Sequence, residues 1–217
     1  MTRSILAALL LLAGCGGAGE PPARTEPAAP PARTAGEPRR VQAVPGAPGV
    51  VDSILLFRGA APNPVQVLVP EENGTDALPL AERITTPDLD FDGEPDLALL
   101  SLSAGANSLT EYWRYNAMSG RFQPLGVFDT FRPDSAAREW VNFNRGGHAG
   151  RIWTAGRFRV ADSRVVQTRR EAQDVSEETG RYFRTVHELR AGAFVETARR
   201  PVSEDSLVAG PSWEAKP

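Results

Sequence analysis

Cysteine, histidine and lysine are scarce in this sequence of 217 residues, which contains one cysteine, two histidines and one lysine. Because the cysteine, Cys15, lies near the N-terminus, the rest of the chain can form no internal disulfide and offers no thiol for catalysis. Two histidines leave little for zinc or nucleophilic chemistry. The G-x-S-x-G, H-E-x-x-H, phosphate-loop and dinucleotide-binding motifs are missing as well. We therefore expect a protein that is not an enzyme. A glycosidase stays open as an alternative, because its two carboxylates need only be close in space.

Basic residues do not dominate the chain either, since 27 acidic residues stand against 24 basic ones. Nucleic-acid binding relies on a dense positive patch that neutralises phosphates. The sequence shows no such patch, and we expect no nucleic acid among the partners.

The longest apolar run stands at the start of the chain, where Arg3 precedes the apolar residues 5–12. This run is too short to span a bilayer as a mature helix, and its layout is that of a cleaved secretory signal. The sequence Leu12-Ala13-Gly14-Cys15 resembles the lipobox of bacterial lipoproteins. The resemblance implies a signal peptide at 1–14 and a lipidated Cys15 that anchors the chain to a membrane. An ordinary signal peptide with a chance cysteine is the alternative.

The residue after the cysteine is Gly16 rather than the aspartate that favours inner-membrane retention in some bacteria with two membranes. We therefore expect a location in the bacterial cell envelope, at the outer membrane, facing the periplasm or the cell surface.

Composition divides the remainder into three parts. Residues 15–49 are rich in proline and alanine, which predicts a disordered linker. Residues 50–202 are long enough to bury a core and are expected to form a single domain. Residues 203–217 are expected to be a flexible C-terminal tail.

Residues 50–202 show mostly the alternation with period two that is typical of strands, as in Val65, Val67 and Val69. Glycine-rich and asparagine-rich turns separate the apolar stretches. The predicted strands cover 51–57, 65–69, 97–103, 109–116, 138–143, 151–160, 164–172, 181–190 and 193–200. One short helix or turn is expected at 133–138. This pattern predicts an all-β fold, an antiparallel meander that is propeller-like or a β-sandwich.

The segment from Asp88 to Leu97, Asp-Leu-Asp-Phe-Asp-Gly-Glu-Pro-Asp-Leu, has the most specific pattern in the chain. It places carboxylates at relative positions 1, 3, 5 and 9, and such a concentration of negative charge is costly without a cation. Ca²⁺ takes six to eight oxygen ligands at roughly 2.3–2.6 Å, and Gly93 permits the sharp turn that such a loop needs. We therefore predict a calcium site. Its expected ligands are Asp88, Asp90, Asp92, Glu94 through its carbonyl, and Asp96.

An EF-hand would require a glutamate at position 12 of this loop, where the sequence has Leu99. Pro95 and the apolar run that follows favour a strand after the loop rather than a helix. The loop resembles the D-x-D-x-D-G-x-x-D-L loops of FG-GAP and VCBS repeats. An acidic turn without metal, held by Asx hydrogen bonds, is the alternative.

Three segments in order give a wider resemblance: the acidic loop, then Tyr112 to Phe122, then Arg145 to Gly150. Over residues 80–200 this order resembles a group of bacterial calcium-binding lipoproteins. The group includes an immunity protein against a peptidoglycan hydrolase secreted by a type IV system. The resemblance implies a protein partner, a cell-wall hydrolase, or else peptidoglycan. A structural envelope lipoprotein without inhibitory activity is the alternative.

The glycine-rich segment with Arg145 and His148 is a candidate partner-binding loop, and a glycine-rich hairpin turn is the competing interpretation. Tyr112, Trp113 and Tyr115 suit either a sugar-stacking platform or, as we prefer for the last two, core packing. For His187 we expect a hydrogen-bonded, half-buried side chain rather than a ligand.

Overall fold

The computed structural model describes residues 39–71, 76–104, 107–207 and 210–211. The predicted signal peptide, Cys15 and most of the predicted linker lie outside the described residues, so these remain predictions. No helix among the described residues is long and apolar enough to cross a membrane.

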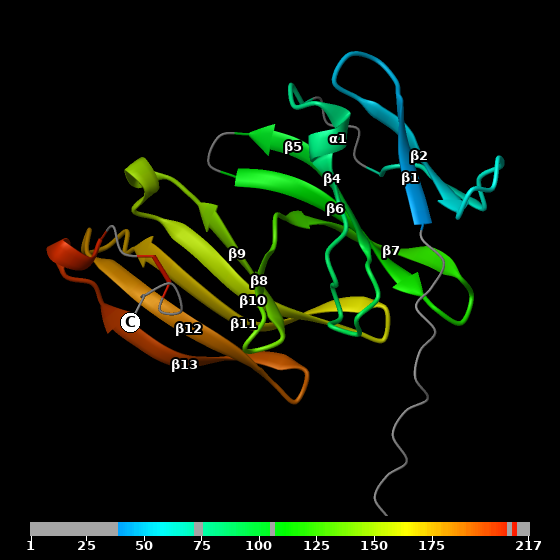
Figure 1. Cartoon of the computed structure of the whole chain (residues 1–217). Helices are drawn as coiled ribbons and strands as arrows, with labels where there is room; N and C mark the ends of the chain where they lie inside the picture. Colours follow the sequence, from blue (N-terminus) through cyan, green and yellow to red (C-terminus); the bar gives the residue numbers. More distant parts are fainter. Residues whose placement is uncertain (1–38, 72–75, 105–106, 208–209, 212–217) are drawn as a thin grey trace, which may run out of the picture. The chain divides into compact units, whose positions relative to one another are not determined.

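The described part of the chain forms three antiparallel sheets (Figure 1). The first sheet contains β1 (Arg39–Pro45), β2 (Val51–Arg58) and β3 (Gln66–Leu68). The second contains β4 (Ile84–Thr85), β5 (Leu97–Ala104), β6 (Asn107–Asn116) and β7 (Arg121–Asp129). The third contains β8 (Arg132–Asp134), β9 (Glu139–Arg145), β10 (Trp153–Ala161), β11 (Arg164–Val175), β12 (Tyr182–Arg190) and β13 (Ala193–Pro201). The helical turns are α1 (Leu80–Arg83), η1 (His148–Gly150) and η2 (Glu204–Ser206). The predicted all-β antiparallel fold is confirmed.

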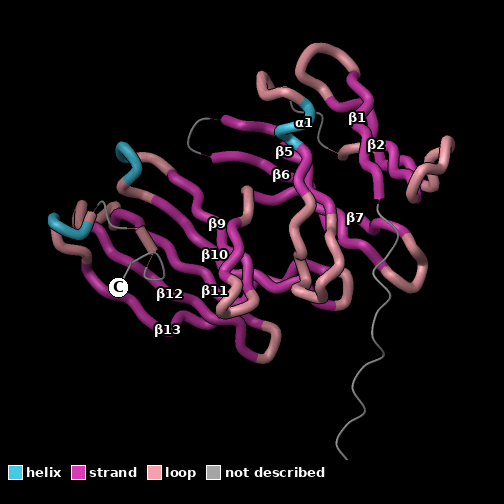
Figure 2. Tube along the Cα trace, in the orientation of Figure 1, coloured by secondary structure: helices cyan, strands magenta, loops and turns pink. Residues whose placement is uncertain are grey.

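Each sheet is a meander, because every strand pairs with its neighbour in the sequence. Tight turns therefore set the topology, and Figure 2 shows them as short loops between paired strands. The β12–β13 turn uses Ala191 and Gly192, at φ 48° and 83°. The β10–β11 turn uses Asp162 and Ser163, at φ 51° and 58°. Such positive φ pairs match the twist of the strands they join.

One core cluster joins the first and second sheets. Its buried members come from β2, β3, β5, β6 and β7 and are Val51, Ile54, Leu56, Leu68, Leu97, Leu99, Trp113 and Phe122. Gln66 on β3 adds a polar link, since its side-chain amide donates to the carbonyl of Phe122 at 2.8 Å and accepts from the amide of Phe122 at 2.9 Å. The Gln66 side chain thus satisfies both backbone groups of Phe122, as a neighbouring strand would.

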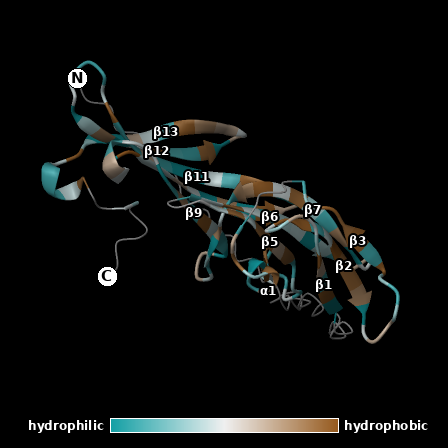
Figure 3. Cartoon of the chain, turned by 90° about the horizontal axis from the view of Figure 1, so that it is seen from above, coloured by the Kyte–Doolittle hydropathy of each residue, from teal (hydrophilic) through white to brown (hydrophobic). Residues whose placement is uncertain are grey.

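A second, largely aromatic cluster joins the second and third sheets and contains Leu89, Ala98, Tyr112, Phe131, Trp140 and Phe158. The ring of Phe131 lies 4.9 Å, centroid to centroid, from the rings of both Tyr112 and Phe158. Leu89 belongs to the acidic loop, so this cluster fixes the loop to the core. Figure 3 shows hydrophobic and hydrophilic stretches alternating along many of these strands.

The folded unit begins earlier than predicted. Residues 39–45, which the sequence places in the disordered linker, form β1 and pair along β2 from Arg39 to Pro45. The proline-rich composition of residues 15–49 predicted disorder and gave no indication of this strand. Its Val41 and Ala43 pack against the first core cluster, which is a contact that composition alone does not reveal.

The alternation at 65–69 is present: Val65, Val67 and Val69 are 47%, 52% and 70% exposed, whereas Leu68 is 6% exposed and faces the core. Residues 133–138 form the end of β8 and a turn, so of the two forms expected there the structure has the turn. One further expectation differs from the structure. The expected flexible tail is in part packed, because Leu207 accepts a hydrogen bond of 2.9 Å from the Gln173 side chain.

Candidate metal centre

The acidic loop lies between β4 and β5, and its last carboxylate, Asp96, directly precedes β5. One carboxylate oxygen each from Asp88, Asp90 and Asp96 lie within 4.8 Å of one another. The structure therefore brings together three of the five predicted ligand residues. Asp92 and Glu94 lie outside this cluster.

Hydrogen bonds within the loop explain its shape. The two carboxylate oxygens of Asp88 accept from the amides of Asp92 and Gly93, both at 2.9 Å. Asp90 accepts from the amide of Asp92 at 3.2 Å, and Asp92 accepts from that of Glu94 at 2.8 Å. Short polar side chains that bond to amides further along the chain are the usual way to curl a loop. Asp92 thus has a defined role in the loop's shape.

Two residues of the loop have positive φ, Phe91 at 55° and Gly93 at 89°. Gly93 adopts this conformation at little cost. Phe91 does not, and its ring packs 5.7 Å from the ring of Trp140, which offsets the strain. The loop therefore combines a local turn with an aromatic anchor.

Asp96 ties the loop to β6. Its side chain is 1% exposed, and its two oxygens accept hydrogen bonds of 2.6 Å from the amides of Leu89 and Tyr115. Burial raises the pKa of Asp96 to about 7, against the lowering effect of these two amides and with a smaller raising effect from Asp90 and Asp92. A bound divalent cation would act in the opposite direction and favour the carboxylate.

Two arginines supply positive charge at the edges of the loop. Arg114 of β6 pairs with Asp90. Arg39 of β1 pairs with Glu94 at 2.6 Å and donates to the carbonyl of Pro95 at 3.0 Å. Glu94 therefore turns its carboxylate towards Arg39, and its role as a ligand through its carbonyl stays a prediction.

The donor set suits a hard cation. All three converging groups are carboxylates, and oxygen is the ligand that Ca²⁺ and Mg²⁺ prefer. The chemistry of the cluster, together with the curled backbone, fits calcium. Such an ion would join the loop, through Asp96, to the neighbouring strand and so act as a cross-link in a domain whose described part contains no cysteine.

The other candidate residues lie elsewhere. Arg145 ends β9, and its main-chain amide and carbonyl bond to the Asn107 side chain at 2.8 and 3.0 Å. His148 lies in η1 at φ 54°, and its Nδ1 is 3.0 Å from the Tyr182 hydroxyl. Both residues are exposed. The segment is a tight turn, and its role in partner binding stays a prediction.

The aromatic platform is not present. Tyr112 and Trp113 are 3% and 2% exposed and belong to the two core clusters. Tyr115 is half-buried, with the Arg39 guanidinium 3.3 Å from its ring centroid. His187 is half-buried as expected. The expected hydrogen bond is not found among the described residues, because the Nε2 of His187 lies 3.8 Å from Glu196 and its Nδ1 has no partner.

No protein-family model and no curated protein matches the chain. A solved structure described as a Xanthomonas type IV secretion system related protein is similar, with a TM-score of 0.51 and 14% identity. The match covers 72% of this chain and 85% of that one. At this identity the likeness shows a shared fold.

Proposed function

We propose that this chain is a calcium-stabilised binding protein of a bacterial envelope, and that its partner is a protein in a setting related to type IV secretion. The observation that carries the proposal is the shared fold, which extends over most of both chains. The oxygen cluster of Asp88, Asp90 and Asp96 supports the calcium part. The lipobox-like residues ending at Cys15 support the envelope location.

The finer form of the proposal is inhibition of a cell-wall hydrolase. An inhibitor must present an exposed group that a catalytic cleft accepts. The η1 turn offers this, since Arg145 and His148 are exposed on a segment with left-handed backbone at His148 and Ala149. Its position is fixed by the bonds to Asn107 and Tyr182, so little ordering entropy would be lost on binding.

The test is capture of the partner. The full chain, purified in detergent and immobilised, is exposed to envelope proteins of the source bacterium, and retained proteins are identified by mass spectrometry. We expect a peptidoglycan hydrolase, whose activity on purified cell walls falls when the chain is added. Recovery of no hydrolase in the presence of calcium argues for a structural envelope lipoprotein instead.

A double variant, Arg145→Ala with His148→Ala, examines the η1 turn. We expect weaker inhibition by about tenfold or more with an unchanged melting temperature. Arg121→Ala is the matched control, because Arg121 is also an exposed arginine at a strand end. Equal inhibition by the double variant and the control would show that the η1 turn is not the inhibitory surface.

A further inference from the structure

Strand β13 forms one edge of the six-stranded sheet, and β8 forms the other. β8 has three residues, whereas β13 has nine, and all nine are exposed. No described strand pairs with the outer side of β13. A long edge strand is a template for pairing with another chain.

The edge lacks some of the usual protection. Phe194 and Val195 are 44% and 43% exposed, so two adjacent large apolar side chains lie on this edge. One irregularity, a register shift opposite Val186 and His187, interrupts the strand near Thr197. The residues on its N-terminal side pair regularly from Ala193 to Glu196.

The tight turn fixes which backbone groups face outwards. Arg190 and Ala193 flank the two-residue turn and form its closing pair. In an antiparallel ladder the bonded pairs alternate along the strand. The peptide groups of Phe194 and Glu196 therefore point away from β12 and are open to a further strand.

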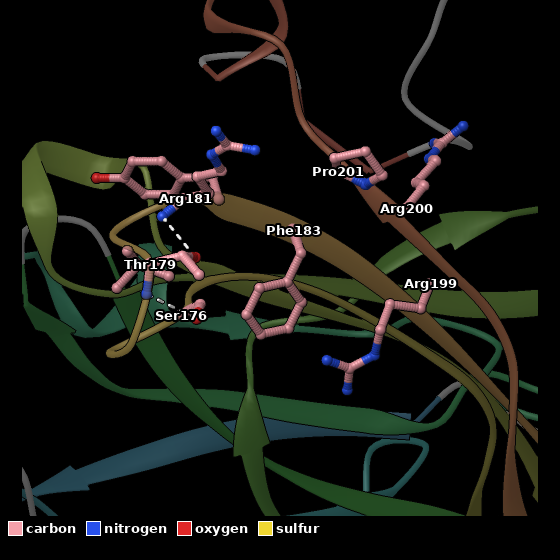
Figure 4. Close-up of a pocket in the computed structure, with 9 residues that line it drawn as sticks. Ser176, Thr179, Arg181, Phe183, Arg199, Arg200 and Pro201 are labelled. Carbon is pink, nitrogen blue, oxygen red and sulfur yellow. Dashed lines mark hydrogen bonds between the residues drawn. The ribbon is translucent and has the colours of Figure 1, made fainter.

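A cavity of about 460 Å³ opens at the far end of β13 (Figure 4). Its lining includes the apolar Val175, Phe183 and Pro201 and the hydroxyl residues Ser176 and Thr179. Figure 4 shows the Phe183 ring with Arg199 on one side and Ser176 and Thr179 on the other. A cavity of this size accepts one or two side chains of a partner.

Three arginines belong to the lining of this cavity: Arg181, Arg199 and Arg200. The pairing of Phe183 with Pro201 and of Arg184 with Arg200 places the Arg200 side chain on the other face of the sheet, and Figure 4 shows it turned away from the Phe183 ring. Arg199 is held by Glu196 through two hydrogen bonds of 3.1 Å and lies 4.7 Å from the Phe183 ring centroid. In the described part of the chain, no carboxylate pairs with the side chains of Arg181 and Arg200. The cavity lining contains no acidic residue. The site therefore complements negative charge beside an apolar group.

We propose that β13 is a docking edge for an extended acidic segment of a protein, which adds to the sheet as a seventh strand. Main-chain bonds to Phe194 and Glu196 provide the pairing. A carboxylate of the segment contacts Arg181, and an apolar side chain contacts Phe183. Strand addition of this kind takes affinity from the backbone and specificity from side-chain pockets. This inference rests on the proposed function, since it names the surface that the protein partner would use.

The test begins without a known partner. Random linear peptides displayed on phage are selected on the full chain purified in detergent, and the best peptide is synthesised. We expect enrichment of aspartate and glutamate together with a strand-like alternation. Nuclear magnetic resonance should show the largest shifts at residues 193–201 and at Phe183. Selected peptides without acidic residues, or with shifts elsewhere, would overturn the proposal.

Two pairs of variants separate pairing from charge. Phe194→Pro removes the phenyl ring and the outward N–H of this residue, whereas Phe194→Ala removes the ring and keeps the N–H. Arg181→Glu reverses a charge at the cavity, whereas Arg190→Glu reverses one at the β12–β13 turn, where Arg190 pairs with Glu188. We expect about tenfold weaker peptide binding for Phe194→Pro and Arg181→Glu, and a much smaller change for their controls.

The same variants distinguish this inference from the proposed function. If a captured envelope partner binds Phe194→Pro and Arg181→Glu as tightly as the parent chain, the β13 surface is wrong and the proposed function stands. If no envelope protein is captured while acidic peptides still bind at β13, the docking edge stands and the proposed function fails.

Discussion

The indole nitrogen of Trp140 donates a hydrogen bond of 2.7 Å to the main-chain carbonyl of Leu89, which lies between the first two aspartates of the acidic loop. Trp140 belongs to β9 of the third sheet, and the loop leads into β5 of the second. The shape of the candidate metal centre therefore depends on a residue that lies 51 positions further along the chain.

Removal of calcium should lower the melting temperature. At free calcium about 100-fold above the dissociation constant, linkage stabilises the fold by about 2.7 kcal/mol. Differential scanning calorimetry with calcium and with excess chelator measures the change. Asp90→Asn should lose the calcium response, while Asp162→Asn, at an exposed turn with φ 51° that asparagine tolerates, should keep it. Superimposable curves with and without calcium, after metal analysis confirms removal, would refute the site.

Trp140→Phe should weaken both stability and calcium binding. The variant keeps a ring in the aromatic cluster and leaves the Leu89 carbonyl, part of a buried residue, without its donor. Loss of a buried partner costs about 1–3 kcal/mol. Urea denaturation and calcium titration provide the two measurements. A variant with lower stability and unchanged calcium affinity would show that the bond supports the core alone.

Gly156→Ala should destabilise the third sheet. A Cβ at this position would lie 2.5 Å from two ring carbons of Phe158 and 2.7 Å from the Gln167 side chain. Phe158 is 9% exposed and packs on Phe131, so the ring has little room to move. We expect a loss of about 1–3 kcal/mol, measured by urea denaturation. Gly147→Ala, with φ −69° and open space around it, is the control and should cost much less.

Gln66→Leu should loosen the contact between the first and second sheets. The substitution removes both hydrogen bonds to the backbone of Phe122, and each unsatisfied group costs about 1–3 kcal/mol where it is buried. Hydrogen exchange should show faster exchange of the Phe122 amide. Gln42→Leu, at an exposed position of β1, should leave that rate unchanged. Equal protection of the Phe122 amide in both variants would mean that the Gln66 side chain does not protect this amide from exchange.

The sequence predicts well what depends on neighbouring residues. The all-β meander follows from period-two alternation and tight turns, and the curl of the acidic loop follows from Asp88, Asp90 and Gly93. Asp96 was identified as part of the cluster because the spacing of the loop is itself local.

What the sequence does not reveal depends on distant residues. Arg39 pairs with Glu94 from 55 positions away, and nothing in its proline-rich surroundings marks it. The exposed Val67 and buried Leu68 show the same limit, since alternation defines two faces of a strand and tertiary packing chooses between them. Tyr112 and Trp113 have the composition of a binding platform, and both are buried because sheets pack on both faces of β6.

The contact between Arg39 and the acidic loop has a mechanical consequence. Arg39 begins the first strand, so it is the point where a tension applied through the N-terminal segment enters the folded unit. Its guanidinium is fastened to Glu94 and Pro95, and the same loop is tied to β6 through Asp96. If the chain is tethered through Cys15 as proposed, a pulling force would load the acidic loop together with the pairing of β1 and β2, which also begins at Arg39. Bound calcium would then add to the force that the attachment of the domain withstands.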